Sequence, residues 1–215
     1  MAFEELRRRM VQEQLELRGI SDPRLLEAFR RVPRHLFVPP EQQAQAYEDH
    51  PIPIGAGQTI SQPYMVALMV QLLKLQGHER ILEVGTGSGY QLAILAELAL
   101  EVYSIERLPE LAAGALGRLE RLGFLNVHIS PGNGSLGWPE HAPYDGVVVA
   151  AGSPGIPQPL VDQLVDGGRL VIPVGSPQTQ TLTLAEKRSG QVRLTALTQC
   201  VFVPLVGEHG WPAES

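Results

Sequence analysis

A glycine-rich turn directly after an apolar run constrains the fold of this chain more than any other feature. Residues 80–90 read Arg-Ile-Leu-Glu-Val-Gly-Thr-Gly-Ser-Gly-Tyr, where 80–84 predicts a buried strand and 90–98 predicts a helix. The glycines between them permit positive φ angles and let a ligand come close to the backbone. The N-terminus of the following helix offers free N–H groups to an electron-rich group. The segment therefore predicts a ligand-binding turn, although a plain strand–turn–helix connection is the simpler interpretation of the loop alone.

The chain beyond this turn alternates apolar strands with helices, which is typical of a parallel sheet covered on both faces. After residue 175 the pattern changes to short strands separated by polar turns, which predicts an antiparallel part. Strands are expected at 102–106, 126–130, 144–151, 169–174, 181–187, 191–197 and 200–203, and helices at 109–122 and 158–165. We expect one α/β domain over 1–215, divided into an N-terminal lobe of helices and loops (1–78), a core (79–175) and a C-terminal β part (176–215).

The N-terminal lobe is predicted to begin with two helices. Apolar residues at helical spacing predict the first over 3–17, ending at Gly19. Asp22 is expected to cap the second helix, with Pro23 at its first position. Residues 31–40 contain too many prolines for regular structure.

A second informative stretch spans residues 47–65 and contains three prolines and two glycines. It predicts an ordered loop packed by its own side chains, and such loops often carry function. The loop leads into a predicted helix over 64–75. Ser61, near its end, suits two interpretations, an N-cap of that helix or a catalytic hydroxyl.

Composition and charge argue against several classes of protein. The net charge of −6 disfavours a general binder of nucleic acid or membrane surfaces. The single cysteine, Cys200, excludes an internal disulfide and indicates a reducing compartment such as the cytoplasm. The charged residues 1–10 do not resemble a signal peptide, and no apolar run approaches the ~20 residues of a membrane span. The histidines show no metal-ligand spacing, so we expect no metal site.

Polar groups follow three predicted strands at the ends where an open α/β sheet binds its ligands. Glu83 closes the first strand, Glu106 closes the second 21 residues after Gly85, and Asn133-Gly134 follow the third. The carboxylate of Glu106 suits the two hydroxyls of a ribose, and an amide suits an adenine edge. A dinucleotide site needs the spacing G-x-G-x-x-G, whereas this loop has G-x-G-x-G after an acid. The spacing favours S-adenosylmethionine over NAD.

Several segments together resemble one enzyme family. The glycine loop is common to many methyltransferases, whereas the segment containing Thr59, Ile60 and Ser61 is specific to the family. On these segments the chain resembles the protein-L-isoaspartate (D-aspartate) O-methyltransferases over most of its length. The segments are Arg31-Val-Pro-Arg-His-Leu-Phe-Val-Pro39, Gly57-Gln-Thr-Ile-Ser-Gln-Pro-Tyr-Met-Val-Ala67, Glu83-Val-Gly-Thr-Gly-Ser-Gly89, Gln163-Leu-Val-Asp-Gly-Gly-Arg-Leu-Val-Ile-Pro-Val-Gly175 and Val201-Phe-Val-Pro-Leu205.

The resemblance implies a Rossmann-like methyltransferase fold and a repair activity. The enzyme would transfer a methyl group from S-adenosylmethionine, leaving S-adenosylhomocysteine, to the free α-carboxylate of L-isoaspartyl residues in damaged proteins and peptides. D-aspartyl residues would be poorer substrates. The ester would cyclise to a succinimide that reopens partly to normal aspartate. We expect a monomer in the cytoplasm.

The resemblance also implies roles for individual residues. Ser61 would be the active-site hydroxyl. The substrate would contact Thr59, Ile60, Ser61, Gln62, Tyr64, Val201 and Pro204. The cofactor would be held by Glu83, Gly85, Thr86, Gly87, Ser88, Gly89, Tyr90, Glu106, Arg107, Asn133 and Gly134. Asn133 departs from the family, which usually has aspartate there, and the tail after Leu205 matches weakly.

Three alternatives remain open at this point. A methyltransferase of the same fold could act on another carboxylate or on a small molecule. A noncatalytic module could bind the cofactor or aged peptides as a sensor. An NAD-dependent oxidoreductase is the third.

Overall fold

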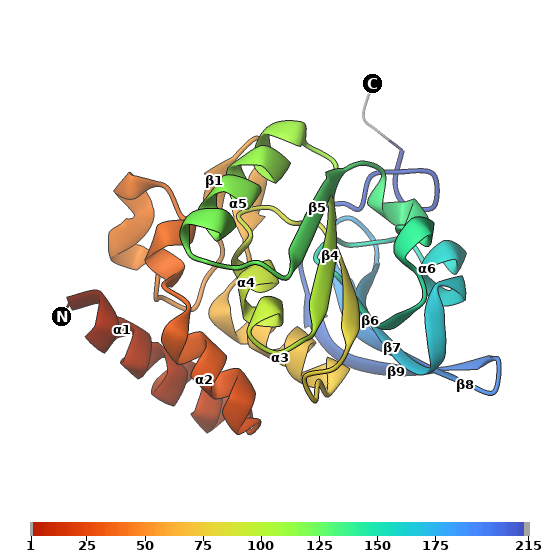
Figure 1. Cartoon of the computed structure of the whole chain (residues 1–215), viewed down its shortest axis with the longest axis horizontal. Helices are drawn as coiled ribbons and strands as arrows, with labels where there is room; N and C mark the ends of the chain where they lie inside the picture. Colours follow the sequence, from red (N-terminus) through yellow and green to blue (C-terminus); the bar gives the residue numbers. More distant parts are fainter. Residues whose placement is uncertain (1, 213–215) are drawn as a thin grey trace.

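A sheet of seven strands runs through the molecule, and a helical lobe packs on one side of it (Figure 1). The computed structural model describes residues 2–212. The strand order is β5-β4-β3-β6-β7-β8-β9, in which β8 is antiparallel to both of its neighbours, β7 and β9, and the other pairs are parallel. This arrangement confirms the predicted α/β class with an antiparallel end. The strands are β3 (Arg80–Val84), β4 (Glu101–Glu106), β5 (Val127–Pro131), β6 (Tyr144–Val149), β7 (Leu164–Gly175), β8 (Gln180–Arg188) and β9 (Gln191–Cys200).

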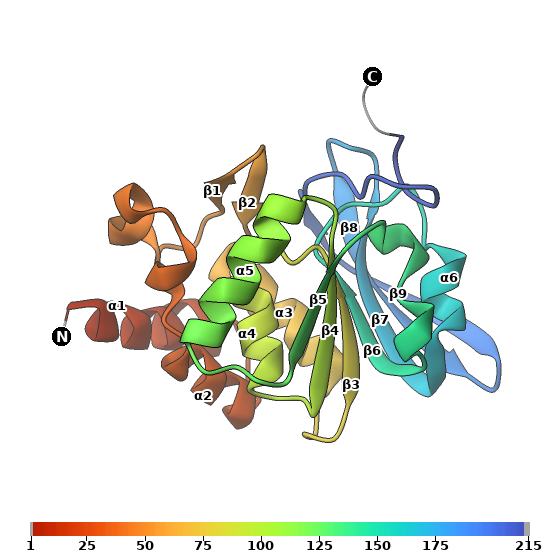
Figure 2. The same cartoon turned by 45° about the horizontal axis from the view of Figure 1, so that its top comes forward.

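Alternate side chains of the central strands enter two separate hydrophobic cores. In β3, Ile81 belongs to one core and Leu82 to the other, as the period of two in a strand requires. Figure 2 shows α3 (Pro63–Leu73), α4 (Tyr90–Ala96) and α5 (Pro109–Arg121) on one face, and α6 (Gln158–Asp162) on the other. Because both faces are covered, the central strands carry apolar residues on both faces, such as Val147, Val148 and Val149 in β6.

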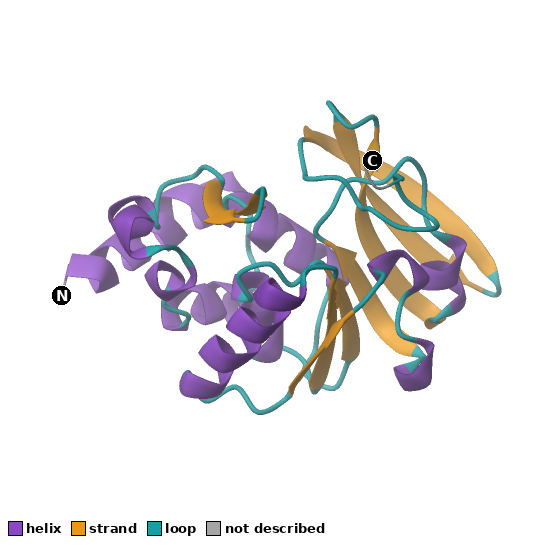
Figure 3. Cartoon of the chain, turned by 90° about the horizontal axis from the view of Figure 1, so that it is seen from above, coloured by secondary structure: helices purple, strands orange, loops and turns teal. Residues whose placement is uncertain are grey.

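The N-terminal lobe is mostly helical, whereas the C-terminal side of the molecule is mostly strand (Figure 3). The predicted first helix is α1 (Ala2–Met10), which continues through a π-helical segment (Val11–Leu15) and a 3₁₀ turn (Glu16–Arg18). It ends at Gly19, with φ 89°, as predicted. The cap of α2 (Pro23–Arg31) is also confirmed, because the Asp22 side chain accepts hydrogen bonds from the N–H groups of Arg24 and Leu25.

Two predictions for the rest of the lobe were wrong. Residues 31–40 do contain regular structure, a 3₁₀ helix at Arg34–Phe37, and a second 3₁₀ helix spans Pro40–Gln45. The segment predicted as a loop contains a small hairpin, β1 (Ile52–Gly55) and β2 (Gln58–Ile60). Its two-residue tip permits pairing despite the prolines, because Ala56 and Gly57 both adopt positive φ angles.

The N-cap interpretation of Ser61 was also wrong. Helix α3 begins at Pro63 and its N-cap is Gln62, with no hydrogen bond from a capping side chain. Ser61 therefore lies between the end of β2 and the cap position. Its hydroxyl plays no capping part in α3, and it lies at the junction of two pockets described below.

Two boundaries in the C-terminal part differ from prediction. The strand expected at 169–174 begins earlier, because β7 starts at Leu164, which pairs with Tyr144, and the register shifts before Gly146 pairs with Arg169. A strand was expected at 200–203, but β9 extends to Cys200 and the chain then leaves its neighbour β8. It crosses to Gly152, whose N–H donates to Val203 O at 2.8 Å and whose carbonyl accepts from Leu205 N at 2.8 Å. This crossing segment, residues 201–206, becomes a wall of the site.

Candidate active site

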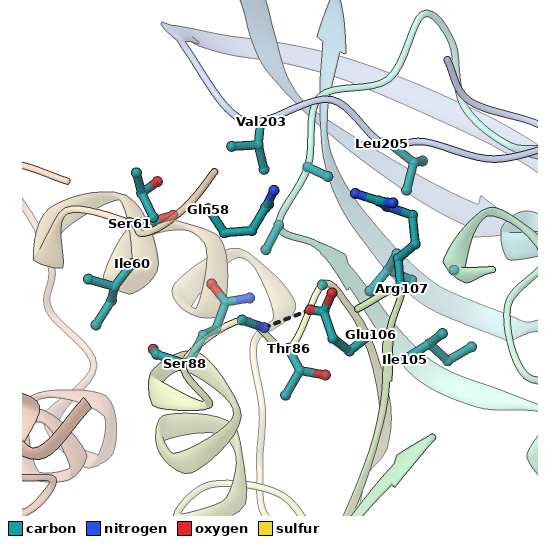
Figure 4. Close-up of a pocket in the computed structure, with 18 of the residues that line it drawn as sticks. Gln58, Ile60, Ser61, Thr86, Ser88, Ile105, Glu106, Arg107, Val203 and Leu205 are labelled. Carbon is teal, nitrogen blue, oxygen red and sulfur yellow. Dashed lines mark hydrogen bonds between the residues drawn. The ribbon is translucent and has the colours of Figure 1, made fainter. Parts of the chain in front are cut away.

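Two adjoining pockets lie at the carboxyl ends of the parallel strands, where an α/β sheet binds ligands. One of them, called the larger pocket because more residues line it, is formed by the glycine loop, the hairpin and the crossing segment (Figure 4). The smaller lies between Pro51, the start of α3 and the end of β9. Thr59, Ser61, Ala150 and Val203 line both pockets. Ser61 is thus placed where a ligand in one pocket would meet a ligand in the other.

Glu106 joins the end of β4 to the glycine loop. Its Oε2 accepts a hydrogen bond from Gly87 N at 2.8 Å (Figure 4), and its Oε1 accepts one from Leu108 N at 3.0 Å. A carboxylate has about four lone-pair sites, so each oxygen can accept a further bond from a hydroxyl. Glu106 lines the larger pocket, and its two acceptor oxygens fit the hydroxyl donors of the ribose of an adenosyl group.

Glu83 lies beneath the glycine loop and not in the lining of either pocket. The carboxyl is fully buried, and Ser104 Oγ donates to its Oε2 at 2.7 Å. Because the Ser104 proton is used there, the Thr86 hydroxyl donates to Ser104 Oγ at 2.6 Å. Burial raises the pKa of Glu83 to about 8, and the Ser104 hydrogen bond offsets this only partly. The residue therefore ties the loop to β4 from below.

This burial predicts a pH dependence of stability in the cofactor-free protein. The native state retains a proton on Glu83 that the unfolded chain releases near pH 4.5. The associated stability is complete below pH 4.5 and is lost as pH rises toward 8. We expect the free energy of unfolding to carry a downward slope of at most about 1.4 kcal/mol per pH unit from this group.

Denaturant unfolding between pH 4 and 9 would measure the slope. Glu83→Gln should remove it, whereas Glu110→Gln, at an exposed carboxylate of α5, should retain it. Equal slopes for the wild type and Glu83→Gln would contradict the assignment.

Gly134 brings the loop after β5 against the end of β3. An added Cβ would lie 2.4 Å from Val84 Cγ1, so no larger residue fits without moving Val84. Gly134 lines the larger pocket, as predicted from its place after the third strand. Asn133 does not line it, and its side-chain oxygen accepts from Ser135 N at 3.1 Å and from Ser135 Oγ at 2.8 Å. A contact of Asn133 with the cofactor stays a prediction.

Most of the other residues predicted to contact the substrate or the cofactor line one of the two pockets, but two of them do not. Tyr64 lies outside both pockets, with the guanidinium carbon of Arg18 3.5 Å from its ring centroid. Gly89 is the N-cap of α4 and also lies outside them. Of the predicted residues, the larger pocket is lined by Thr59, Ile60, Gly85, Thr86, Gly87, Ser88, Tyr90, Arg107 and Pro204. The smaller pocket is lined by Thr59, Gln62 and Val201.

Sequence reasoning missed several lining residues. Ala150 and Ala151 follow β6, and the rule of strand ends that selected Glu106 could have found them. Leu205 and Val206 line the larger pocket, and Gln199 and Cys200 line the smaller. No local signal marks Leu205 and Val206, because the path of the crossing segment depends on its pairing with Gly152, whereas Gln199 and Cys200 lie at the end of β9.

The described part of the chain has neither a cluster of metal-binding side chains nor a membrane-spanning helix. Among residues 2–212, no three His, Cys, Asp or Glu side chains gather so that they could hold a metal ion. Within the same limits, no helix has both the length and the apolar character needed to span a bilayer.

The fold and the pockets define a methyltransferase that uses S-adenosylmethionine. The strand order, the glycine loop after β3 and the carboxylate after β4 carry this conclusion. The chain belongs to the protein-L-isoaspartate(D-aspartate) O-methyltransferase family, whose model matches residues 5–210. Its reaction is methyl transfer from S-adenosylmethionine to isoaspartyl residues, a step of protein repair.

Similar proteins support the assignment over nearly the full length. Protein-L-isoaspartate O-methyltransferase 1 of Syntrophobacter fumaroxidans is 57% identical over 209 residues, which are 97% of this chain and 98% of that protein. A solved protein-L-isoaspartate O-methyltransferase is 29% identical with a TM-score of 0.85, covering 94% of this chain and 67% of that one. A Plasmodium falciparum protein described as such an enzyme was solved with S-adenosyl-L-homocysteine. It is 27% identical, with a TM-score of 0.79 and coverage of 92% and 96%.

Proposed function

We propose that the larger pocket holds the cofactor, that the smaller pocket holds the isoaspartyl residue, and that Ser61 lies between the reacting groups. The observation that carries this division is the position of Ser61 in the lining of both pockets. Its hydroxyl donates to the substrate α-carboxylate and orients one oxygen toward the methyl group. Orientation of this kind can lower a barrier by roughly 7–11 kcal/mol in favourable cases.

The smaller pocket supports a reaction that needs no general base. An α-carboxylate has a reference pKa of about 3.3–3.7 and is already an anion at neutral pH. Cys200 is the one ionisable side chain among the residues that line this pocket. Burial raises the pKa of its thiol to about 11, so it stays neutral and does not compete as a nucleophile. The acceptor therefore arrives already reactive.

On the cofactor side, S-adenosylmethionine supplies a methyl group activated by a sulfonium. Glu106 accepts hydrogen bonds from ribose hydroxyls while it holds Gly87 and Leu108. Glu83 acts from beneath by fixing Thr86 through Ser104. Arg107 and the crossing segment cover the opposite side of the pocket (Figure 4).

The substrate is held mainly through features that are independent of its sequence. Thr59, Gln62 and Val201 form walls of the smaller pocket, and Ile60 and Pro204 lie on the cofactor side. Most of these residues offer backbone or apolar contacts, which suits damaged sites in many proteins. L-isoaspartyl residues are the main substrates and D-aspartyl residues poorer ones. A monomer acting in the cytoplasm stays a prediction of the sequence.

The test uses S-adenosylmethionine labelled in the methyl group and two peptides of one sequence. One peptide carries L-isoaspartate and the other normal aspartate. We expect base-labile label on the isoaspartyl peptide alone. Label on neither peptide, with the protein folded and binding S-adenosylhomocysteine, would reject the proposal and favour another acceptor or a sensor.

A further inference from the structure

Arg34 is a cation buried in the N-terminal lobe beside the site. Its side chain is 0% exposed, and within residues 2–212 it forms no salt bridge. Asp49, the one carboxylate that influences its charge, is already paired with Arg18. Burial lowers the pKa of Arg34 only to about 10, so the guanidinium remains protonated at neutral pH. An unpaired buried charge is costly to the fold, so its retention calls for a reason.

The guanidinium is bonded directly to the active-site segment. Nε donates to Ala46 O at 2.7 Å, and Nη2 donates to Ser61 O at 2.8 Å. Its carbon lies 4.7 Å from the ring centroid of Tyr90, which lines the larger pocket. Arg34 therefore contacts two residues of the site without lining either pocket itself.

The bond to Ser61 O also sets the direction of the next N–H. A trans peptide is planar, so the N–H of Gln62 points opposite to the carbonyl of Ser61, away from Arg34. Gln62 lines the smaller pocket, and the described residues offer its N–H no hydrogen-bond partner. The Ser61 hydroxyl and the Gln62 N–H are thus two donors next to the same peptide bond. A carboxylate accepts such a pair well.

Among the charged residues near the two pockets, Arg34 is the cation that is bonded to the Ser61–Gln62 peptide. The smaller pocket has no charged lining residue, and the larger has only Glu106 and Arg107. Arg107 follows Glu106 in the chain and lies toward the crossing segment, across the pocket from Ser61 (Figure 4). A charge in a buried, low-dielectric position acts over several ångströms with little screening.

We propose that Arg34 is a positioning residue that makes the site selective for a negatively charged acceptor. It fixes the orientation of the Ser61–Gln62 peptide bond and supplies a positive electrostatic potential at the position of the substrate carboxylate. The proposal rests on the proposed role of Ser61. It has a consequence for turnover, since the ester product has lost the negative charge and is held less tightly than the substrate.

The experiment compares two peptides in the wild type and in variants. One peptide carries L-isoaspartate, and the other carries the same residue with its α-carboxylate replaced by a neutral carboxamide, used as a competitive inhibitor. In the wild type the isoaspartyl peptide should bind at least about tenfold more tightly than the carboxamide. Arg34→Gln should raise KM for the isoaspartyl peptide about tenfold and leave the inhibition constant of the carboxamide within about twofold. Arg34→Lys, which keeps the charge, should stay within about threefold of the wild-type KM.

Controls separate charge from structure. Arg24→Gln removes another guanidinium that donates to two carbonyls, those of Leu75 and Leu98, and should change neither peptide. Circular dichroism and S-adenosylhomocysteine titration report folding and the cofactor pocket. A merely structural role for Arg34 would weaken both peptides equally, and Arg34→Lys would then be as impaired as Arg34→Gln. Either result overturns the proposal.

Binding of the two peptides by the wild type tests the proposal even where Arg34→Gln does not fold. Equal binding of the two peptides by the wild type would overturn the selectivity without any variant. The failure of the underlying function looks different, because no methylation of the isoaspartyl peptide would then occur. Methylation that depends on Ser61 but shows no preference for the charged peptide would reject the role of Arg34 alone.

Discussion

Ser61→Ala is expected to lower kcat/KM for an isoaspartyl peptide by about 10- to 100-fold while leaving the melting temperature unchanged. A hydrogen bond to a charged group contributes about 1.5–3 kcal/mol, and each 1.4 kcal/mol is a factor of ten in rate. Stability should be retained because α3 is capped at Gln62 and Ser61 makes no capping bond. Steady-state kinetics and thermal unfolding monitored by circular dichroism would measure the two effects.

The matched control for Ser61→Ala is Ser189→Ala. Ser189 lies in the exposed turn between β8 and β9, away from both pockets. It should leave kinetics and melting temperature as in the wild type. A Ser61→Ala variant with normal kinetics would reject the catalytic role. A variant that lost helicity and melted early would show that the serine acts on the fold instead.

Glu106→Ala should reduce affinity for S-adenosylhomocysteine by about 100-fold. The variant loses the acceptors proposed for the ribose hydroxyls, and two charged hydrogen bonds are together worth about 3 kcal/mol or more. It also leaves Gly87 N and Leu108 N without their carboxylate partner, so the melting temperature should fall by several degrees. Isothermal titration calorimetry measures the affinity, and the binding stoichiometry shows how much of the variant is folded.

Glu101→Ala is the control at the other end of the same strand. Its carboxylate contacts Arg80 and the Tyr103 hydroxyl, far from the carboxyl edge of the sheet. It should leave cofactor affinity unchanged. Unchanged affinity in Glu106→Ala would mean that this carboxylate only supports the glycine loop.

The parts of the site that follow one strand could be predicted from the sequence. Glu106 and Gly134 were selected because they lie at or just after the ends of predicted strands, and both line the larger pocket, where we propose that the cofactor binds. The capping role of Asp22 was readable for the same reason, since the cap and its two N–H donors lie within three residues. Such signals depend only on neighbours in the chain.

Other roles could not be predicted from the sequence, because the neighbouring residues allow more than one outcome. Ser61 and Gln62 can both precede a helix that starts with proline, and only the structure distinguishes the cap. Tyr64 belongs to a motif of the family, yet its ring packs under Arg18, 46 positions earlier in the chain. Asn133 binds its own turn through Ser135.

The sequence by itself determined the α/β class, the glycine loop and the acids at the strand ends, because periodicity and turn chemistry act over a few residues. Only the tertiary structure decided which segments meet at Ser61. The contact from Arg34 spans 27 positions, and the crossing segment reaches Gly152 after the chain has left the sheet. Contacts of that kind arise from the packing of the lobe against the sheet, which also buries the Arg34 side chain completely.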